Sequence, residues 1–233
     1  MNTSYGICSV KGNKHHINED RYRLLGSHAP LIQRVGRGEI YAVMDGVGGA
    51  PRGLAAAQHI ADRLTDFFRN ANSIPATRQG LRELLTAISI EINQWGMMDG
   101  TDRPLGAAAS TIAWFMPKQE LAIFHAGDTL GLHFDGRTLH KLTRDHSAGR
   151  GLLRYFGQGE GFSVDESVVK FTEGDTLCLV TDGVTKVMNI GEIEAILKEV
   201  IDPQRAADEI AQRALGKRSP DDITALVVQL EEW

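Results

Sequence analysis

Four aspartates stand at the ends of strand-like segments, where carboxylates from distant parts of the chain can meet. Asp45 and Asp182 each follow a short apolar run, Asp128 lies in a tight turn between two strand-like segments, and Asp221 precedes the last such segment. Carboxylates held close together repel one another strongly unless a cation lies between them. The pattern therefore predicts a divalent-cation site. An all-oxygen ligand set favours Mg²⁺ or Mn²⁺ over zinc or copper.

Asp-Gly is also a common turn sequence, so each occurrence needs its own interpretation. Asp135-Gly136 joins two strand-like segments and is interpreted as a hairpin turn. Asp45-Gly46 and Asp182-Gly183 differ because each ends a buried-looking strand. Their glycines would let another group approach the backbone closely, as a binding site requires.

The hydrophobic pattern predicts which elements carry these residues. Apolar residues at helical spacing predict four helices, at 60–68, 81–95, 193–200 and 203–214. Alternating or β-branched segments predict ten strands, at 5–10, 21–25, 39–44, 111–116, 120–126, 129–134, 138–142, 168–171, 176–181 and 223–230. The short connections at 117–119, 127–128 and 135–136 predict antiparallel hairpins. This order of elements is typical of an α+β domain with helices outside antiparallel sheets.

Composition and charge narrow the possible environments and partners. The chain has 233 residues, of which 42% are hydrophobic and 24% charged, and a formal net charge of −5. We expect one domain over residues 1–233, a monomer, without a nucleic-acid partner because no long basic run is present. No apolar stretch approaches the ~18 residues of a membrane span. Cys8 and Cys178 are far apart in apolar segments, which is typical of thiols in a reducing cytoplasm.

Seven short motifs follow one another along the chain, and they are Asn18-Glu19-Asp20, Val43-Met44-Asp45-Gly46-Val47-Gly48-Gly49, Ser110-Thr111, Ala126-Gly127-Asp128-Thr129, Leu142-Thr143-Arg144-Asp145-His146-Ser147, Val180-Thr181-Asp182-Gly183-Val184 and Pro220-Asp221-Asp222-Ile223-Thr224. Their order resembles that of the metal-dependent protein phosphatase family (PPM, the type-2C serine/threonine phosphatases), specifically its small bacterial stand-alone members. Any one of them is a weak signal, but seven in order along the whole chain are a strong one.

The resemblance implies a four-layer α-β-β-α sandwich, with two antiparallel sheets between helix pairs, and two bound Mn²⁺ or Mg²⁺ ions. By resemblance Asp45 bridges the two ions, and Asp182 and Asp221 complete the protein ligands of the first. The Gly46 carbonyl and a water held by Glu19 belong to the second ion.

Other positions follow from the resemblance or depart from it. Asp20 resembles a residue that orients the ligands, and Asp128 resembles the ligand of a weak third ion. Where the family often has an acidic ligand for that third ion, this chain has Lys186. We expect Lys186 to weaken or replace the third ion; the alternative is that it faces solvent.

Two further departures concern the substrate side of the site. The family usually has a phosphate-binding arginine where this chain has His15, with Lys14 beside it. Either could supply a positive charge for substrate phosphate, or both could be solvated loop residues. The stretch between Asp145 and Asp182 is short for the family, which predicts that residues 149–161 form a shortened, mobile flap. Arg154 in this flap could reach substrate phosphate, although a solvated arginine is the commoner outcome.

The resemblance implies a serine/threonine protein phosphatase, an enzyme that hydrolyses phosphoserine and phosphothreonine on proteins by direct attack of a metal-bridging hydroxide. Its partners would be phosphorylated substrates of a serine/threonine kinase, in signal transduction. The alternative is a catalytically weak or partner-activated regulatory module that binds phosphoproteins. The presence of Glu19, Asp20, Asp45, Asp182 and Asp221 favours the enzyme, because a module without catalytic constraint tolerates the loss of such residues.

Overall fold

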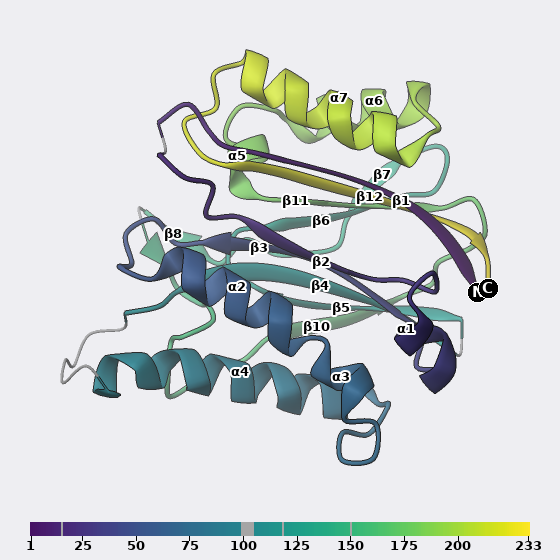
Figure 1. Ribbon diagram of the computed structural model, residues 1–233. Coiled ribbons are helices and arrows are strands. Elements are labelled where there is room, and N and C mark those ends of the chain that lie inside the picture. The colour runs from purple at the N-terminus through teal and green to yellow at the C-terminus, as the bar shows by residue number, and fades with distance from the viewer. Residues whose placement is uncertain (15, 99–104, 118, 150) are drawn as a thin grey trace.

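The computed structural model describes residues 1–14, 16–98, 105–117, 119–149 and 151–233, and it has two five-stranded sheets (Figure 1). The first sheet contains, in spatial order, β1 (Asn2–Val10), β12 (Ile223–Glu232), β11 (Thr176–Val180), β6 (Leu130–Phe134) and β7 (Leu139–Lys141). The second contains β10 (Asp165–Val169), β5 (Glu120–Ala126), β4 (Ala108–Met116), β3 (Glu39–Gly46) and β2 (Arg21–Leu25). All pairings in these two sheets are antiparallel, as the sequence predicted.

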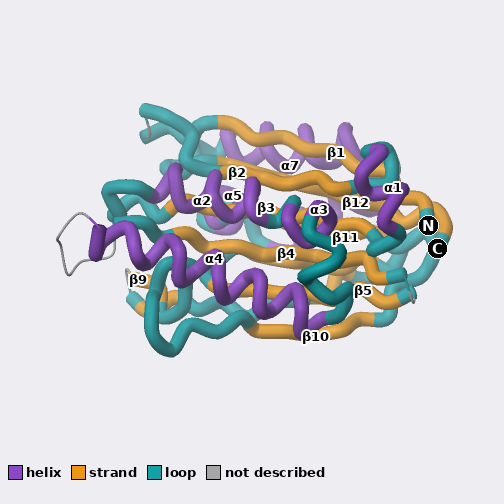
Figure 2. Tube along the Cα trace, turned by 60° about the horizontal axis from the view of Figure 1, so that its bottom comes forward, coloured by secondary structure: helices purple, strands orange, loops and turns teal. Residues whose placement is uncertain are grey.

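Helices cover the outer face of each sheet. The described helices are α1 (Pro30–Val35), α2 (Gly53–Arg63), α3 (Asp66–Arg69), α4 (Arg78–Met98), α5 (Asp182–Thr185), α6 (Ile190–Glu199) and α7 (Pro203–Gly216). Helices α6 and α7 lie against the first sheet, and α2 and α4 run across the second (Figures 1 and 2). The predicted four-layer α-β-β-α sandwich is confirmed. Among the described residues, none of the helices combines the length and apolar character that crossing a membrane requires.

Side-chain alternation along the strands produces the layers. On β3, Ile40 and Met44 are completely buried on the face that packs under the helices, whereas Tyr41 and Val43 belong to a separate core between the two sheets. Because successive side chains of a strand point to opposite faces, a central strand buried on both faces must be apolar throughout. This is why the segments before the aspartates read as continuous apolar runs.

Two of the C-terminal helices begin at residues that satisfy their free backbone N–H groups. Asn189 and Glu192 form a reciprocal capping box at the start of α6. At the start of α7, the Asp202 side chain accepts a hydrogen bond from the Arg205 N–H, and Pro203 follows directly. These caps fix where each helix begins: α7 starts at the predicted residue 203, whereas α6 starts at residue 190, three residues before the predicted 193.

The turn after β5 corrects one prediction. Strands β5 and β6 were expected to form a hairpin through Gly127-Asp128, but they belong to different sheets. The turn crosses from one sheet to the other, with Gly127 at φ +120° and tightly packed, since a Cβ there would lie 2.2 Å from the Ala109 Cβ. Only glycine readily adopts this conformation. As a result, Asp128 stands at the junction of the two sheets.

Two predictions for the segment after β7 also need correction. The strand expected at 168–171 is β10, and its register with β5 begins at Asp165 opposite His125. Phe171 lies beyond that strand and is buried between the sheets instead. The flap expected to be mobile, residues 149–161, contains β9 (Gly151–Leu152), which pairs with β8 (Ser147–Ala148) just before the flap, and Phe156 anchors it. Phe156 is completely buried and exchanges two backbone hydrogen bonds with Ala108.

Close backbone packing joins β11 to the segment that precedes β12. A Cβ on Gly183 would lie 1.8 Å from the Asp222 carbonyl oxygen, and a Cβ on Gly12 would lie 2.1 Å from that of Asp221. The Ser219 hydroxyl donates a hydrogen bond of 2.7 Å to the Gly183 carbonyl. Glycine at 183 and 12 therefore lets three segments meet around the Asp221-Asp222 pair.

We predict that Gly183→Ala destabilises the protein by about 2 to 3 kcal/mol, because the added methyl group overlaps backbone that cannot move aside freely. Gly216→Ala is the matched control, since a Cβ at Gly216, the last residue of α7, meets nothing within 4 Å. It should be neutral or slightly stabilising. Urea unfolding of both variants measures the difference, and equal stabilities would contradict the close packing.

Candidate metal centre

Three of the predicted aspartates converge at one end of the sandwich. Ligand oxygens of Asp45, Asp128 and Asp182 all lie within 4.8 Å of one another. Asp45 lies near the end of β3, Asp128 follows β5 at the junction of the sheets, and Asp182 follows β11. Antiparallel strands from two packed sheets thus bring together residues that are far apart in sequence. This grouping matches the chemistry of a hard divalent cation.

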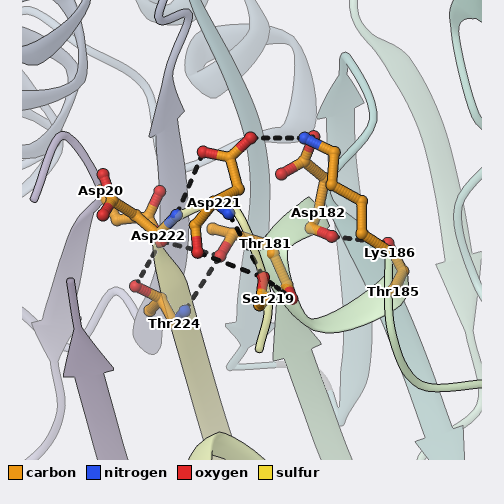
Figure 3. A network of polar contacts seen from close by, with 10 residues as sticks. Asp20, Thr181, Asp182, Thr185, Lys186, Ser219, Asp221, Asp222 and Thr224 are labelled. Carbon is orange, nitrogen blue, oxygen red and sulfur yellow. Dashed lines mark hydrogen bonds and ion pairs between the residues drawn. The ribbon is translucent and has the colours of Figure 1, made fainter. Parts of the chain in front are cut away.

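Asp221 joins this group through a lysine. The Lys186 ammonium lies 2.5 Å from the Oδ2 atom of Asp182 and 2.5 Å from the Oδ2 atom of Asp221 (Figure 3). These two ion pairs hold the pKa of Lys186 above its usual value, against the opposing effect of its burial. Lys186 therefore neither points only to solvent nor forms an ion pair with Asp128. Its partners are the two residues that the resemblance assigns to the first ion.

Asp20 lies beneath the site and connects the two strands that carry the ligands. Its buried Oδ2 accepts hydrogen bonds of 2.7 Å from the hydroxyls of Thr181 and Thr224 (Figure 3). Thr181 directly precedes Asp182, and its hydroxyl also accepts a hydrogen bond from the Thr224 N–H. Burial raises the pKa of Asp20 to about 7, against the two hydroxyl donors that lower it. This geometry fits a residue that orients the ligands rather than one that binds an ion directly.

Asp222 is a structural residue of the site that the sequence analysis quoted in a motif without giving it a role. Its two carboxylate oxygens accept 2.8 Å hydrogen bonds, one from the Gly12 N–H and the other from the Glu19 N–H. It therefore fixes the N-terminal loop, with Glu19, against the segment that carries Asp221. The sequence contained a clue to this role: side chains of two adjacent residues before a strand point in different directions, so Asp221 and Asp222 can have different partners.

Lys14, one of the two predicted substrate-phosphate residues, lies on the same N-terminal loop. The Lys14 N–H donates a 3.3 Å hydrogen bond to the Pro220 carbonyl, so the loop runs beside the segment that leads to Asp221. The residue itself is exposed. His15 lies outside the residues that the structure describes.

The electrostatics of the cluster favour a bound cation. Burial, followed by the nearby carboxylates of Asp20 and Asp182, raises the pKa of Asp45 well above its usual value. Burial and then Asp182 raise the pKa of Asp128 to about 6. The buried Oδ1 atoms of Asp20 and Asp182 have no hydrogen-bond partner among the described residues. Buried oxygens of this kind are costly unless a cation or a proton satisfies them, so these residues fit Mn²⁺ or Mg²⁺.

A cavity of about 790 Å³ opens over the aspartates. Its walls include Val47, Ala109, Leu152 and Tyr155. Of the described residues that line it, Lys186 is the one with a basic side chain. Leu152 and Tyr155 come from the shortened flap. The cavity therefore leaves space for a ligand directly above the carboxylates.

The flap is connected to the Asp128 turn through a buried histidine. The His146 Nδ1 atom accepts a hydrogen bond from the Gly127 N–H, and its Nε2 atom donates to Asp165 at 2.9 Å. Arg154, which was a candidate for substrate phosphate, instead forms an ion pair with Asp165. The flap is therefore tied, through Asp165 and His146, to the turn that carries Asp128.

The raised pKa values predict how the stability of the metal-free protein depends on pH. Asp20 and Asp45 hold protons at a higher pH in the folded protein than in the unfolded chain, where aspartate titrates near 4. The free energy of unfolding in chelator should therefore fall as pH rises through about 7. Buried His125, with its pKa lowered to about 4, acts in the opposite direction below its ordinary pKa of 6.5, so the test runs from pH 6.5 to 8.

Thermal unfolding in chelator should show a midpoint that falls over this range, by about 2 to 4 °C for each kcal/mol lost. Saturating Mn²⁺ should remove most of the fall, because ion binding requires ionised carboxylates. The unfolding midpoint of Asp20→Asn should fall less steeply with pH than that of the parent protein. A midpoint that rises with pH in chelator would contradict the electrostatic description of the cluster.

Comparison with known proteins gives the same assignment. Residues 41–231 match the family model described as Stage II sporulation protein E (SpoIIE). A serine/threonine phosphatase stp of Listeria welshimeri is 27% identical over 241 residues, which cover 94% of this chain and 92% of that protein.

Two solved structures share the fold. PppA, described as a key regulatory component of T6SS in Pseudomonas aeruginosa, has a TM-score of 0.81 at 24% identity and covers 97% of both chains. The catalytic domain of the serine threonine protein phosphatase PstP, solved in complex with two manganese ions, has a TM-score of 0.80 at 21% identity over 99% of both chains. The two structures show the shared fold, and the match of residues 41–231 to the SpoIIE model, together with the seven motifs, shows that the chain belongs to the metal-dependent protein phosphatase family, which includes the SpoIIE domain.

Proposed function

We propose that the chain is a metal-dependent serine/threonine protein phosphatase that hydrolyses phosphoserine and phosphothreonine on proteins. The main support is the group formed by Asp45, Asp128 and Asp182 at the base of an open cavity. The carboxylate oxygens of these three residues lie within 4.8 Å of one another. The similarity to a Listeria serine/threonine phosphatase over nearly the whole chain supports the same reaction.

The chain's own residues have distinct proposed tasks in this reaction. Asp45 would be a ligand of both of two Mn²⁺ or Mg²⁺ ions, Asp182 and Asp221 would hold the first, and the Gly46 carbonyl together with a water held by Glu19 would serve the second. When bound, the ions supply an activated water for attack on phosphorus and stabilise negative charge on the phosphoryl oxygens. The protein contributes a fixed ligand geometry, which reduces the cost of reorganisation during the reaction.

The supporting residues follow from their positions. Asp20 keeps the Asp182 and Asp221 segments in register through Thr181 and Thr224. By resemblance Asp128 would hold a third ion, and we propose that this ion is weak or absent because the Lys186 ammonium lies beside Asp182 in the same cavity.

Lys14 and His15 contact the phosphate of the substrate in this proposal. The support for Lys14 is its exposed position on a loop that runs beside the Asp221 segment. His15 is proposed on the sequence alone.

The wider setting is also part of the proposal. Residues 1–233 form one catalytic domain, which acts as a cytoplasmic monomer on proteins that a serine/threonine kinase has phosphorylated. The cavity over the aspartates gives an exposed phosphorylated segment of a substrate protein access to the site in this proposal.

We predict that Asp45→Asn lowers Mn²⁺-dependent phosphate release from a phosphothreonine peptide by more than about a hundredfold, because the shared carboxylate of the two ions is lost. Asp62→Asn is the matched control: this exposed carboxylate on α2 accepts a hydrogen bond from Gln58 and should leave the rate unchanged. Each protein is assayed with Mn²⁺, with Mg²⁺ and with chelator, after its fold has been checked by circular dichroism.

Three results would separate the alternatives. Release that needs both a metal and Asp45 supports the enzyme. A folded protein that releases no phosphate with either metal, yet binds the phosphopeptide, would support the regulatory binding module instead. Release that persists in chelator or in Asp45→Asn would refute the proposed metal site.

A further inference from the structure

The two ion pairs of Lys186 involve the oxygens that a metal ion would use. Its ammonium lies 2.5 Å from one oxygen of Asp182 and 2.5 Å from one oxygen of Asp221. Divalent ions of this class bind carboxylate oxygens at about 2.0 to 2.2 Å. An ammonium and a divalent ion on the same pair of oxygens would lie within a few ångströms of each other, where their positive charges repel strongly. The lysine therefore occupies the space beside these oxygens that a bound metal ion would need.

The local structure directs Lys186 to this place. It caps the short helix α5 four residues after Asp182, so the two side chains lie on the same face of one turn. Asp221 reaches the same ammonium from the segment before β12 (Figure 3). The Asp182 and Asp221 side chains are only 15% and 26% exposed, whereas Lys186 itself is 41% exposed and has room to move toward the cavity.

Another lysine of the protein shows what an ordinary surface pair looks like. Lys198 pairs with Glu194 at the same spacing of four residues and also at 2.5 Å, on α6. That pair involves one carboxylate rather than two, and neither of its residues lines the cavity over the aspartates. Lys198 is therefore a control with the same residue spacing and distance, but away from the cavity and its aspartates.

We propose that Lys186 is a built-in competitor of the metal at Asp182 and Asp221. In the metal-free protein its ammonium neutralises both carboxylates and holds them together. An incoming ion has to displace it into the cavity, so the affinity for the ion is lower than the carboxylates alone would give. This inference rests on the proposed function, because it concerns the metal site of that phosphatase.

Two physical effects act in the same direction. Any interaction made only in the metal-free state stabilises that state and lowers the apparent affinity for the ion. After displacement, the positive charge remains on a side chain attached beside the site and repels the bound ion. Removing the charge relieves both effects, whereas replacing it with another cation relieves neither.

The test measures Mn²⁺ binding directly, from the signal of free Mn²⁺ in electron paramagnetic resonance and by calorimetric titration of the full chain. Lys186→Met and Lys186→Gln should bind the first Mn²⁺ at least about tenfold more tightly than the parent protein. Lys186→Arg and the control Lys198→Met should stay within about threefold of the parent value. None of these measurements depends on phosphate release.

Thermal unfolding of the same proteins supplies the second measurement. In chelator, Lys186→Met should unfold at a lower temperature than the parent, because two carboxylates lose their counterion. In saturating Mn²⁺ the two should unfold at similar temperatures, so that Mn²⁺ stabilises the variant by the larger amount. This pattern also establishes that the variant folds.

Each outcome has one meaning. Tighter Mn²⁺ binding in Lys186→Met and Lys186→Gln, but not in Lys198→Met, supports competition. Equal or weaker binding in both Lys186 variants, while the parent protein binds Mn²⁺, overturns this inference and leaves the proposed phosphatase intact. Absence of Mn²⁺ binding by the parent and by every variant overturns the inference and the proposed metal-dependent function together.

Discussion

Electrostatic repulsion among carboxylates is the constraint on which the rest of this end of the molecule depends. Asp45, Asp128 and Asp182 are held with oxygens within 4.8 Å of one another, partly buried, at the junction of two sheets. Such an arrangement costs folding free energy unless protons, a lysine or a metal ion compensate the charge. Protons can compensate the charge because the pKa of Asp45 is raised, and a lysine can do so because Lys186 lies beside Asp182.

The scaffold keeps the carboxylates together despite their repulsion. Each lies next to a strand that is hydrogen-bonded in a sheet, so none can move away without breaking the ladder. Asp20 ties the end of β11 to the start of β12, and Asp222 ties the same segment to the N-terminal loop. Gly183 allows these backbones to pack closely enough for the ties to form. Preorganised ligands of this kind suit a catalytic metal site.

The sequence predicted the layers and the converging aspartates because both depend on local signals, namely apolar runs and the polar residue that ends each run. It did not predict that the Gly127 turn passes between sheets, since turn length alone does not determine which sheet the next strand joins. Neither did it reveal the partners of Lys186, because the contact with Asp221 joins segments 35 positions apart in the chain. The anchoring of Phe156 on Ala108 is likewise a long-range contact in a glycine-rich segment whose composition suggested mobility.

The central claim is that Asp45, Asp182 and Asp221 bind divalent ions within the cavity. Anomalous X-ray diffraction from a crystal grown with Mn²⁺, recorded on both sides of the manganese absorption edge, tests it most directly. We expect anomalous peaks within ligand distance of these carboxylates, with the Lys186 ammonium moved away from Asp182 and Asp221. Manganese bound only elsewhere on the protein, with these carboxylates still paired to Lys186 at saturating Mn²⁺, would contradict it.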